Sequence, residues 1–211
     1  MNKHTALALT TVLVVALFTA GVATAGDYVC KNQTLGAITI TGNLIVPGGA
    51  FCDINGTHVA GNAIVNQNAG LLADVSSVIG GDVTIAHGGQ FAAFGGSTVG
   101  GNVACNQCRV ADLHSSTVNG NLTDNGLTQG AFISNSTIGG TLSITDSFAR
   151  RANFQITGNR IGANLEFNDN KGASNISNNT IAGTLACSGN TPPPTGSGNT
   201  ALSKTGQCAT L

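Results

Sequence analysis

Charged side chains gather in one part of this chain. Seven of them lie between positions 146 and 171, although Asp, Glu, Lys and Arg make up only 8% of all residues. A guanidinium group binds carboxylates and other planar anions, and a carboxylate beside it could hold a cation or move a proton. The seven residues are Asp146, Arg150, Arg151, Arg160, Glu166, Asp169 and Lys171. The first five are therefore our candidate ligand-binding residues, and the expected ligand is an acidic polysaccharide.

The same cluster also fits a solvated patch that keeps the protein soluble and discourages side-by-side association. Both interpretations stay open on the residues alone. The cluster surrounds an irregularity of the sequence, the long step described below. Insertions in repeat proteins form loops on one face, and such loops often carry a binding site.

Three aspartates recur at nearly the same place in different repeats, namely Asp53, Asp74 and Asp112. Two carboxylates on neighbouring strands could share a cation or raise one another's pKa. Ala93 interrupts this column before Asp112. We therefore favour solvated carboxylates here, and we expect no metal site and no cofactor.

Six cysteines follow an apolar N-terminal run, and an even number favours a disulfide framework in an exported protein. Cys105 and Cys108 have C-x-x-C spacing, but a redox pair or half of a zinc site would want a helix N-terminus or a second ligand pair nearby. Neither is evident, so we expect a local disulfide, with a thiol-redox role as the alternative.

The other four cysteines should close the two ends of the molecule. Cys30 and Cys52 are 22 residues apart, and Cys187 and Cys208 are 21 residues apart. Both separations are close to one sequence repeat. Each bond would therefore tie a flanking segment onto the end that it must cover.

A repeated phrase predicts the fold that positions these residues. Gly-Asp-Val-Thr-Ile at 81–85 is one of eight related copies, which follow one another at 19 or 20 residues except for one step of 23 between Gly140 and Ala163. A unit of this size cannot bury its own apolar face and must stack on its neighbours. The sequence thus predicts an all-β, single-domain parallel β-solenoid of about eight coils, each of roughly 20 residues.

Three columns of apolar residues should form the core of the solenoid, because alternate residues of a strand face the same side. The first contains Ile40, Val59, Ile79, Val99, Val118, Ile138, Ile161 and Ile181. The second contains Leu44, Ala63, Val83, Val103, Leu122, Leu142, Leu165 and Leu185. The third contains Ile54, Val75, Phe94, Leu113, Ile133, Ile156 and Ile176.

The polar residue after each repeat glycine should lie at a corner of the coil, where glycine and asparagine tolerate turns. Stacked amides at such a corner can bond from coil to coil. The column that we expect to form this ladder contains Asn43, Asn62, Asp82, Asn102, Asn121, Thr141, Asn164 and Thr184.

The chain begins with the three parts of a secretory signal peptide: Lys3 and His4, an apolar run at 6–20, and the A-x-A site that ends at Ala25. We expect cleavage after Ala25 and an extracellular, secreted protein without membrane attachment. The expected organisation is a signal peptide at 1–25, an N-terminal cap at 26–34, the β-solenoid at 35–189, and a Pro- and Gly-rich tail and cap at 190–211.

Composition excludes one class of partner. The net charge is −1, and the chain shows no run of basic residues. Nucleic-acid binding would need a basic stripe, so we expect no nucleic-acid partner.

These repeats resemble those of secreted parallel β-helix proteins of the pectate-lyase-like type, and the short coil is similar to that of bactofilins. The Ala-Asp-Leu and Gly-Asn-Leu steps, as at 111–113 and 120–122, partly resemble pentapeptide repeats, but the inward positions are not evenly five apart. The first resemblance implies a rod-shaped solenoid. Lyases of that type use an Asp, Lys and Arg constellation that cannot be matched here, so the catalytic residues are unknown.

Two functions stay open on these grounds. The first is a secreted, non-enzymatic structural or adhesive rod, a monomer because its ends are capped, with an extracellular polysaccharide or a cell surface as its partner. The second is a polysaccharide-binding or polysaccharide-cleaving β-helix enzyme, a lyase or glycoside hydrolase, that uses the long coil at 140–163.

Overall fold

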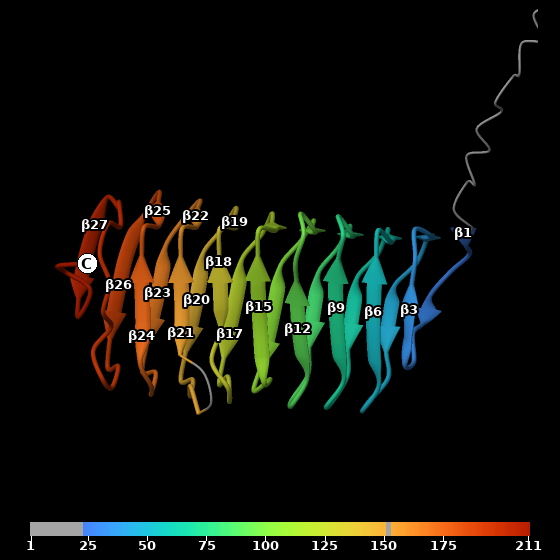
Figure 1. Cartoon of the computed structure of the whole chain (residues 1–211), viewed down its shortest axis with the longest axis horizontal. Coiled ribbons are helices and arrows are strands. Elements are labelled where there is room, and N and C mark those ends of the chain that lie inside the picture. The colour runs from blue at the N-terminus through green and yellow to red at the C-terminus, as the bar shows by residue number, and fades with distance from the viewer. Residues whose placement is uncertain (1–22, 151–152) are drawn as a thin grey trace, which may run out of the picture.

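The computed structural model describes residues 23–150 and 153–211. The expected signal peptide therefore lies outside the described residues up to position 22, and Arg151 lies outside them as well. All regular elements of the described residues are strands, and they wind into a parallel β-solenoid of about nine coils. The strands stack side by side along the long axis of the molecule, from β3 near the N-terminal end to β27 at the other end (Figure 1).

Each coil contributes one strand to each of three sheets, so that β3, β4 and β5 lie in three different sheets and the order then repeats. We call these sheets A, B and C.

Sheet A contains, in spatial order, β1 (Ala23–Thr24), β4 (Thr39–Ile40), β7 (His58–Val59), β10 (Val78–Ile79), β13 (Thr98–Val99), β16 (Thr117–Val118), β19 (Thr137–Ile138), β22 (Arg160–Ile161) and β25 (Thr180–Ile181). Sheet B contains β2 (Tyr28–Val29), β5 (Leu44–Val46), β8 (Ala63–Val65), β11 (Val83–Ile85), β14 (Val103–Asn106), β17 (Leu122–Asn125), β20 (Leu142–Thr145), β23 (Leu165–Asn168), β26 (Thr184–Ser188) and β27 (Ser203–Gly206). Sheet C contains β3 (Gln33–Leu35), β6 (Phe51–Asn55), β9 (Gly70–Asp74), β12 (Gln90–Ala93), β15 (Val110–His114), β18 (Phe132–Ser134), β21 (Phe154–Thr157) and β24 (Ser174–Ser177).

The predicted fold class is confirmed, and the sheets extend beyond the eight repeat copies. The additional strands come from flanking segments without the repeat phrase: β2 pairs in parallel with β5, and β27 pairs in parallel with β26. A strand can join a parallel ladder through its backbone alone. The repeat count therefore underestimates the length of the stack.

Two of the three predicted core columns are confirmed in full, since every member is buried. The third column is wrong at Val75 and Phe94. Register pairs Ile54 with Ala73, and Ala73 with Ala93, so the two alanines point inward. Val75 follows the strand in a left-handed turn with φ 47° and is 54% exposed.

The small alanines in this column are matched by large neighbours on the same strands. Leu71 and Phe91 are fully buried two residues before Ala73 and Ala93. The following coil reverses the order, with Ala111 before Leu113. In these three coils a large residue at one inward position of sheet C is accompanied by an alanine at the other, as close packing of the interior requires.

The predicted amide ladder is present at the corner between sheets A and B. The Oδ1 atom of each Asn or Asp rung accepts a hydrogen bond from the backbone N–H of the rung in the next coil, as from Asn62 to Asn43 at 2.8 Å and from Thr141 to Asn121 at 2.8 Å. Thr141 has no Oδ1 atom, so the ladder is interrupted between Thr141 and Asn164. A glycine precedes every rung except Asn164, which follows Ala163. The glycine is required where an Asn or Asp lies one coil before it, because a Cβ atom at Gly81 would collide with Oδ1 of Asn62. The ladder therefore explains the repeat phrase.

Two further ladders, which the sequence reasoning missed, are buried inside the other corners. In one, Nδ2 of Asn179 donates to Oδ1 of Asn199 at 2.9 Å and to the carbonyl of Ile156 at 2.8 Å. The buried polar column between sheets C and A contains Thr57, Ser77, Ser97, Ser116, Ser136, Asn159, Asn179 and Asn199. The Ser97 hydroxyl interrupts this ladder, because it makes no hydrogen bond with the described residues. The rungs between sheets B and C are Ser147, Asn170 and Asn190.

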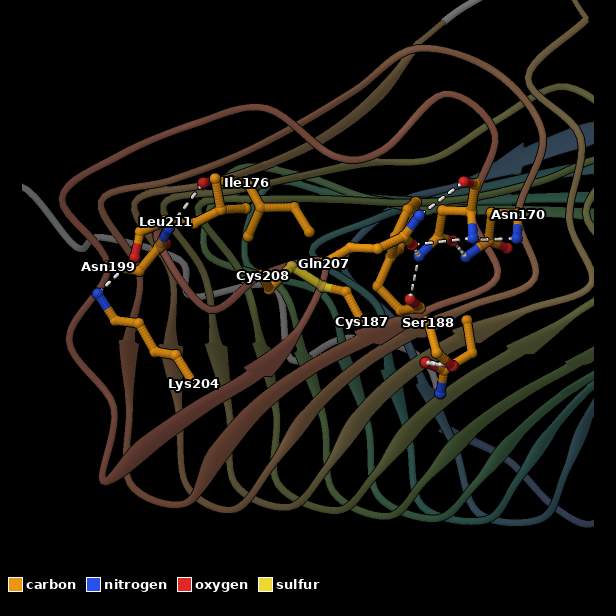
Figure 2. The surroundings of a disulfide bond; sticks show 12 residues. Asn170, Ile176, Cys187, Ser188, Asn199, Lys204, Gln207, Cys208 and Leu211 are labelled. Carbon is orange, nitrogen blue, oxygen red and sulfur yellow. Dashed lines mark hydrogen bonds between the residues drawn. A yellow bond between two sulfur atoms is a disulfide. The ribbon is translucent and has the colours of Figure 1, made fainter.

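The predicted disulfides are confirmed as pairs: Cys30 with Cys52, Cys105 with Cys108, and Cys187 with Cys208. Figure 2 shows the last of them at the C-terminal end, beside Gln207. The Gln207 amide accepts hydrogen bonds from the backbone N–H and the Nδ2 atom of Asn190, both at 2.9 Å, and donates to the Asn190 carbonyl at 2.9 Å. Gln207 thus completes a buried ladder that would otherwise end with unpaired groups.

Candidate functional site

The structure separates most of the predicted ligand-binding residues. Arg160 lies on β22 in sheet A, and Glu166 lies on β23 in sheet B. Asp146 is exposed in the turn after β20, in a left-handed conformation with φ 50°. Arg150 is exposed in the loop that follows. Arg150, Arg160 and Glu166 therefore lie at different places around the coil, although they are close in the sequence.

Arg150 instead joins a residue that sequence reasoning did not select. Arg109, Thr128, Gln129 and Arg150 line a hollow of about 320 Å³, which we call the basic pocket. It lies where the chain passes from sheet B to sheet C. The backbone N–H of Gln129 donates to the Arg109 carbonyl at 3.1 Å, which stacks the two coils there. Arg109 lies two coils before Arg150, so their proximity could be predicted only from the register.

The lining of the basic pocket is polar and positively charged. It consists of two arginines, one threonine and one glutamine, and none of the described residues that line it is acidic. The Arg150 guanidinium lies 5.7 Å from the centre of the Phe148 ring, and the Lys171 ammonium lies 5.1 Å from the same centre. Such cation–π contacts hold charged side chains over an aromatic face. The arrangement can bind an anionic group such as a carboxylate or a sulfate.

The three aspartates are not stacked as expected. Register places Asp53 and Asp112 in one outward column of sheet C, with Leu72 and Ala92 between them. Asp74 pairs with Asn55 in the next outward column. The carboxylates of Asp53 and Asp112 are thus three coils apart, or roughly 14 Å at the usual strand spacing. They cannot share one cation.

A second hollow lies on the outer face of sheet C. Its volume is about 340 Å³, and we call it the sheet C groove. It forms where β9 presents Gly70, which has no side chain, between Phe51 of β6 and Gln90 of β12. The lining residues are Phe51, Leu71, Leu72, Gln90, Phe91, Ala92, Val110 and Asp112. The groove is therefore apolar apart from one amide and one carboxyl group.

Asp112 is a half-buried acid at one end of this groove. Burial raises the pKa of its carboxyl group from 3.8 to about 6, and the hydrogen bond from the backbone N–H of Phe132 at 2.8 Å opposes part of this rise. The charged form is disfavoured because the apolar surroundings solvate it poorly. Near pH 6 the groove therefore changes its charge.

Asp124 is a second unusual acid, and it lies inside the solenoid. It is completely buried, and neither carboxyl oxygen has a hydrogen-bond partner among the described residues. Burial raises the pKa of Asp124 well above its ordinary value, and the charge of Asp112 raises it further. A signal for this residue was available, because the other repeat copies have an aliphatic residue, Phe or Cys at this position: Val46, Val65, Ile85, Cys105, Ile144, Phe167 and Cys187.

The two raised acids do not form a catalytic pair. Asp112 faces outward from β15, whereas Asp124 faces inward from β17. Paired carboxylates in glycosidases flank the same bond of one substrate, and the wall of the coil separates these two. Within residues 23–150 and 153–211, no group of three or more His, Cys, Asp or Glu side chains is placed to hold a metal ion.

Comparisons of the chain with protein-family models, with curated proteins and with solved structures found no match. Among the described residues, no helix has the length and apolar character needed to cross a membrane. The two hollows and the ends of the rod are therefore the features of the molecule from which a function can be inferred.

Proposed function

We propose that the protein is a secreted, non-enzymatic β-solenoid rod that attaches to anionic polysaccharide of a cell surface or matrix through the basic pocket. The observation that carries this proposal is the joint position of Arg109 and Arg150 in one hollow, where the other lining residues, Thr128 and Gln129, are uncharged. Two guanidinium groups at one site can bind the carboxylate or sulfate groups of such a polymer. A rod that repeats small coils can also present this site at a fixed distance from its ends.

The capped ends support a rod that acts as a monomer. An open solenoid exposes an apolar interior and unpaired backbone groups, to which further chains can add. Here a disulfide ties Cys30 to Cys52 at one end and another ties Cys187 to Cys208 at the other. Three disulfides also agree with an oxidising compartment outside the cell.

The alternative is an enzyme that cleaves polysaccharide, and one observation favours it. The raised pKa of Asp112, about 6, would suit a general acid. Hydrolysis with paired carboxylates would need a second carboxylate facing the groove, and the nearest raised acid, Asp124, is inside the core. We therefore prefer binding without cleavage.

Binding to immobilised polysaccharides tests this function. We expect the disulfide-bonded protein to bind polygalacturonate and alginate but not neutral dextran, and to bind more weakly as salt screens the charges. Arg109→Gln with Arg150→Gln should abolish binding without changing the melting temperature. Arg160→Gln is the matched control, because Arg160 lies on sheet A away from the pocket, and it should bind like the native protein.

Three results would overturn the proposal. Equal binding to dextran would show that charge is not recognised, and equal loss in the Arg160→Gln variant would show that the basic pocket is not the site. Release of unsaturated or reducing sugar ends during incubation would establish the enzyme instead.

A further inference from the structure

The sheet C groove has the form of a small ligand site that is separate from the basic pocket. Phe51 is 43% exposed at one wall, and Leu72 and Ala92 form the floor between the coils. The volume of about 340 Å³ lies within the range of small-molecule sites, which are mostly apolar with a few placed polar groups. An apolar ring or short chain can therefore fill the groove.

The hollow depends on the absence of a side chain at one position. A Cβ atom at Gly70 would lie 2.8 Å from the Phe51 ring and 2.9 Å from the Gln90 amide nitrogen, so both side chains lean over the glycine. In the neighbouring column, Ala92 follows Leu72, and this step from a large to a small residue leaves room beside Asp112. The groove is thus formed by the sequence at β9 and β12 and not by a loop.

The polar end of the groove carries an uncompensated carboxylate. Oδ1 of Asp112 accepts from the backbone N–H of Phe132, and Oδ2 has no partner within the described part of the chain. The strands on either side of β15 bring no cation to it: β12 presents Gln90 and Ala92, and β18 presents Phe132 and Ser134.

The remaining titratable groups around Asp112 do not neutralise it either. His114, two residues further along β15, is bonded to Ser134 at 2.6 Å. Arg109 precedes β15 and lines the basic pocket, and Asp124 beneath the sheet is also an acid. A ligand cation is therefore the partner that the carboxylate lacks.

From this combination we propose that the sheet C groove binds small amphiphilic amines, with the apolar body on Leu72, Ala92 and Phe51 and the ammonium group against the Asp112 carboxylate. Aromatic Phe51 can also attract a cation through its ring face. An anion of the same shape would be repelled by the carboxylate, and a neutral alcohol would gain only the apolar contact. The chemical class is thus distinct from the polyanion assigned to the basic pocket.

Three probes that share one phenyl ring and differ in their head group test the proposal: 2-phenylethylamine, 2-phenylethanol and 3-phenylpropionate. Binding is measured by isothermal titration and by ligand-observed NMR on the disulfide-bonded protein at pH 7.5. We expect the amine to bind at least about tenfold more tightly than the alcohol, since hydrogen bonds to charged groups contribute that much. The propionate should not bind.

Matched variants locate the site. Asp112→Asn should remove the preference of the amine over the alcohol, and Ala92→Leu should fill the groove and abolish binding of both. Ala104→Leu, at an exposed outward position of sheet B, is the control and should bind like the native protein. Lowering the pH to 5 protonates Asp112 and should weaken amine binding in the native protein but not in Asp112→Asn, a contrast that also separates Asp112 from His114.

The proposal is wrong if the alcohol binds the native protein as tightly as the amine, if Asp112→Asn leaves the preference unchanged, or if Ala92→Leu binds normally. It is also wrong if no probe binds at all. Because these probes are not polyanions and the variants leave Arg109 and Arg150 intact, failure here does not affect the proposed function.

Discussion

Asp124 occupies the inward position next to Cys105 in sheet B, one coil further on, and its buried carboxyl group replaces an apolar side chain there. The next coil continues the column with Ile144. Neither carboxyl oxygen makes a hydrogen bond with the part of the chain that the structure describes. An unsatisfied polar group in such a place destabilises the folded state.

Replacing this acid should therefore stabilise the protein. Asp124→Val restores the kind of residue found in other coils at this position, such as Val46 and Val65. We expect the free energy of unfolding to rise by at least about 1 kcal/mol, the lower limit of the penalty for an unsatisfied buried group. Urea denaturation at pH 7 measures this. Thr123→Val, one residue earlier and exposed, is the control and should change stability by less than about 0.5 kcal/mol; a loss of stability in Asp124→Val would mean that the carboxyl group has a partner in solution.

The same acids determine how stability depends on pH. Burial raises the pKa of Asp112 to about 6 and that of Asp124 well above 3.8, the ordinary value that both regain on unfolding. Above pH 3.8 the native state holds more protons than the unfolded state, so the free energy of unfolding falls as the pH rises. The stabilising contribution of protonated Asp112 to the free energy of unfolding is lost between about pH 4 and pH 6. Asp124 extends the decline of this free energy to higher pH. Urea midpoints should be higher at pH 4.5 than at pH 7.5, and Asp112→Asn with Asp124→Val should flatten this difference.

A third prediction concerns inward and outward positions of one strand. Leu122 is fully buried in β17, and Thr123 is exposed. Leu122→Asp should unfold the rod because an unpaired carboxylate among stacked aliphatic residues costs several kcal/mol. Thr123→Asp should change stability by less than about 1 kcal/mol. Thermal melts compare the two variants, and equal effects would contradict the alternation of this strand.

The repeat phrase was enough to predict the stacked strands, two of the three core columns and the exposed ladder, because period and alternation are properties of neighbouring residues. It misplaced Val75 and Phe94, because Ala73 and Ala93 occupy the inward positions of these two strands. Val75 is two residues from the inward position and Phe94 is one, and shifts of this kind are corrected only by the strand register.

The candidate sites were harder to predict than the fold. Arg150 was selected from local charge density, whereas Arg109, which lines the same pocket, lies in a different coil. Residues about 40 positions apart meet only after two turns of the solenoid. The sheet C groove depends on Gly70 and on one small residue in a neighbouring column, and no motif in the sequence marks such a gap.

A fourth prediction concerns export. The A-x-A site before Gly26 predicts a mature chain that starts at Gly26. Cleavage there would remove β1, which pairs with β4, but would keep Asp27, whose Oδ1 accepts from the backbone N–H of Asn43 at 2.8 Å. Intact-mass measurement of protein from the culture medium checks the cleavage site. A secreted mass that still includes residues 1–25 would contradict the prediction.

The last prediction concerns the C-terminal end. Gln207 makes three hydrogen bonds with Asn190, and the neighbouring Cys208 is bonded to Cys187. Gln207→Ala would leave buried groups of Asn190 unpaired and should cost about 2 kcal/mol.

Removing the disulfide with alanine at both positions should cost about 3 kcal/mol, the value expected for a loop of this length. Because the disulfide holds Gln207 in place, the variant that combines both changes should lose less free energy of unfolding than the sum of the two separate losses. Urea denaturation of the single and combined variants measures this, with Gln67→Ala in an exposed turn as the control. If Gln207→Ala behaves like Gln67→Ala, the C-terminal segment does not complete the buried ladder in solution, and the end of the rod is open to other chains.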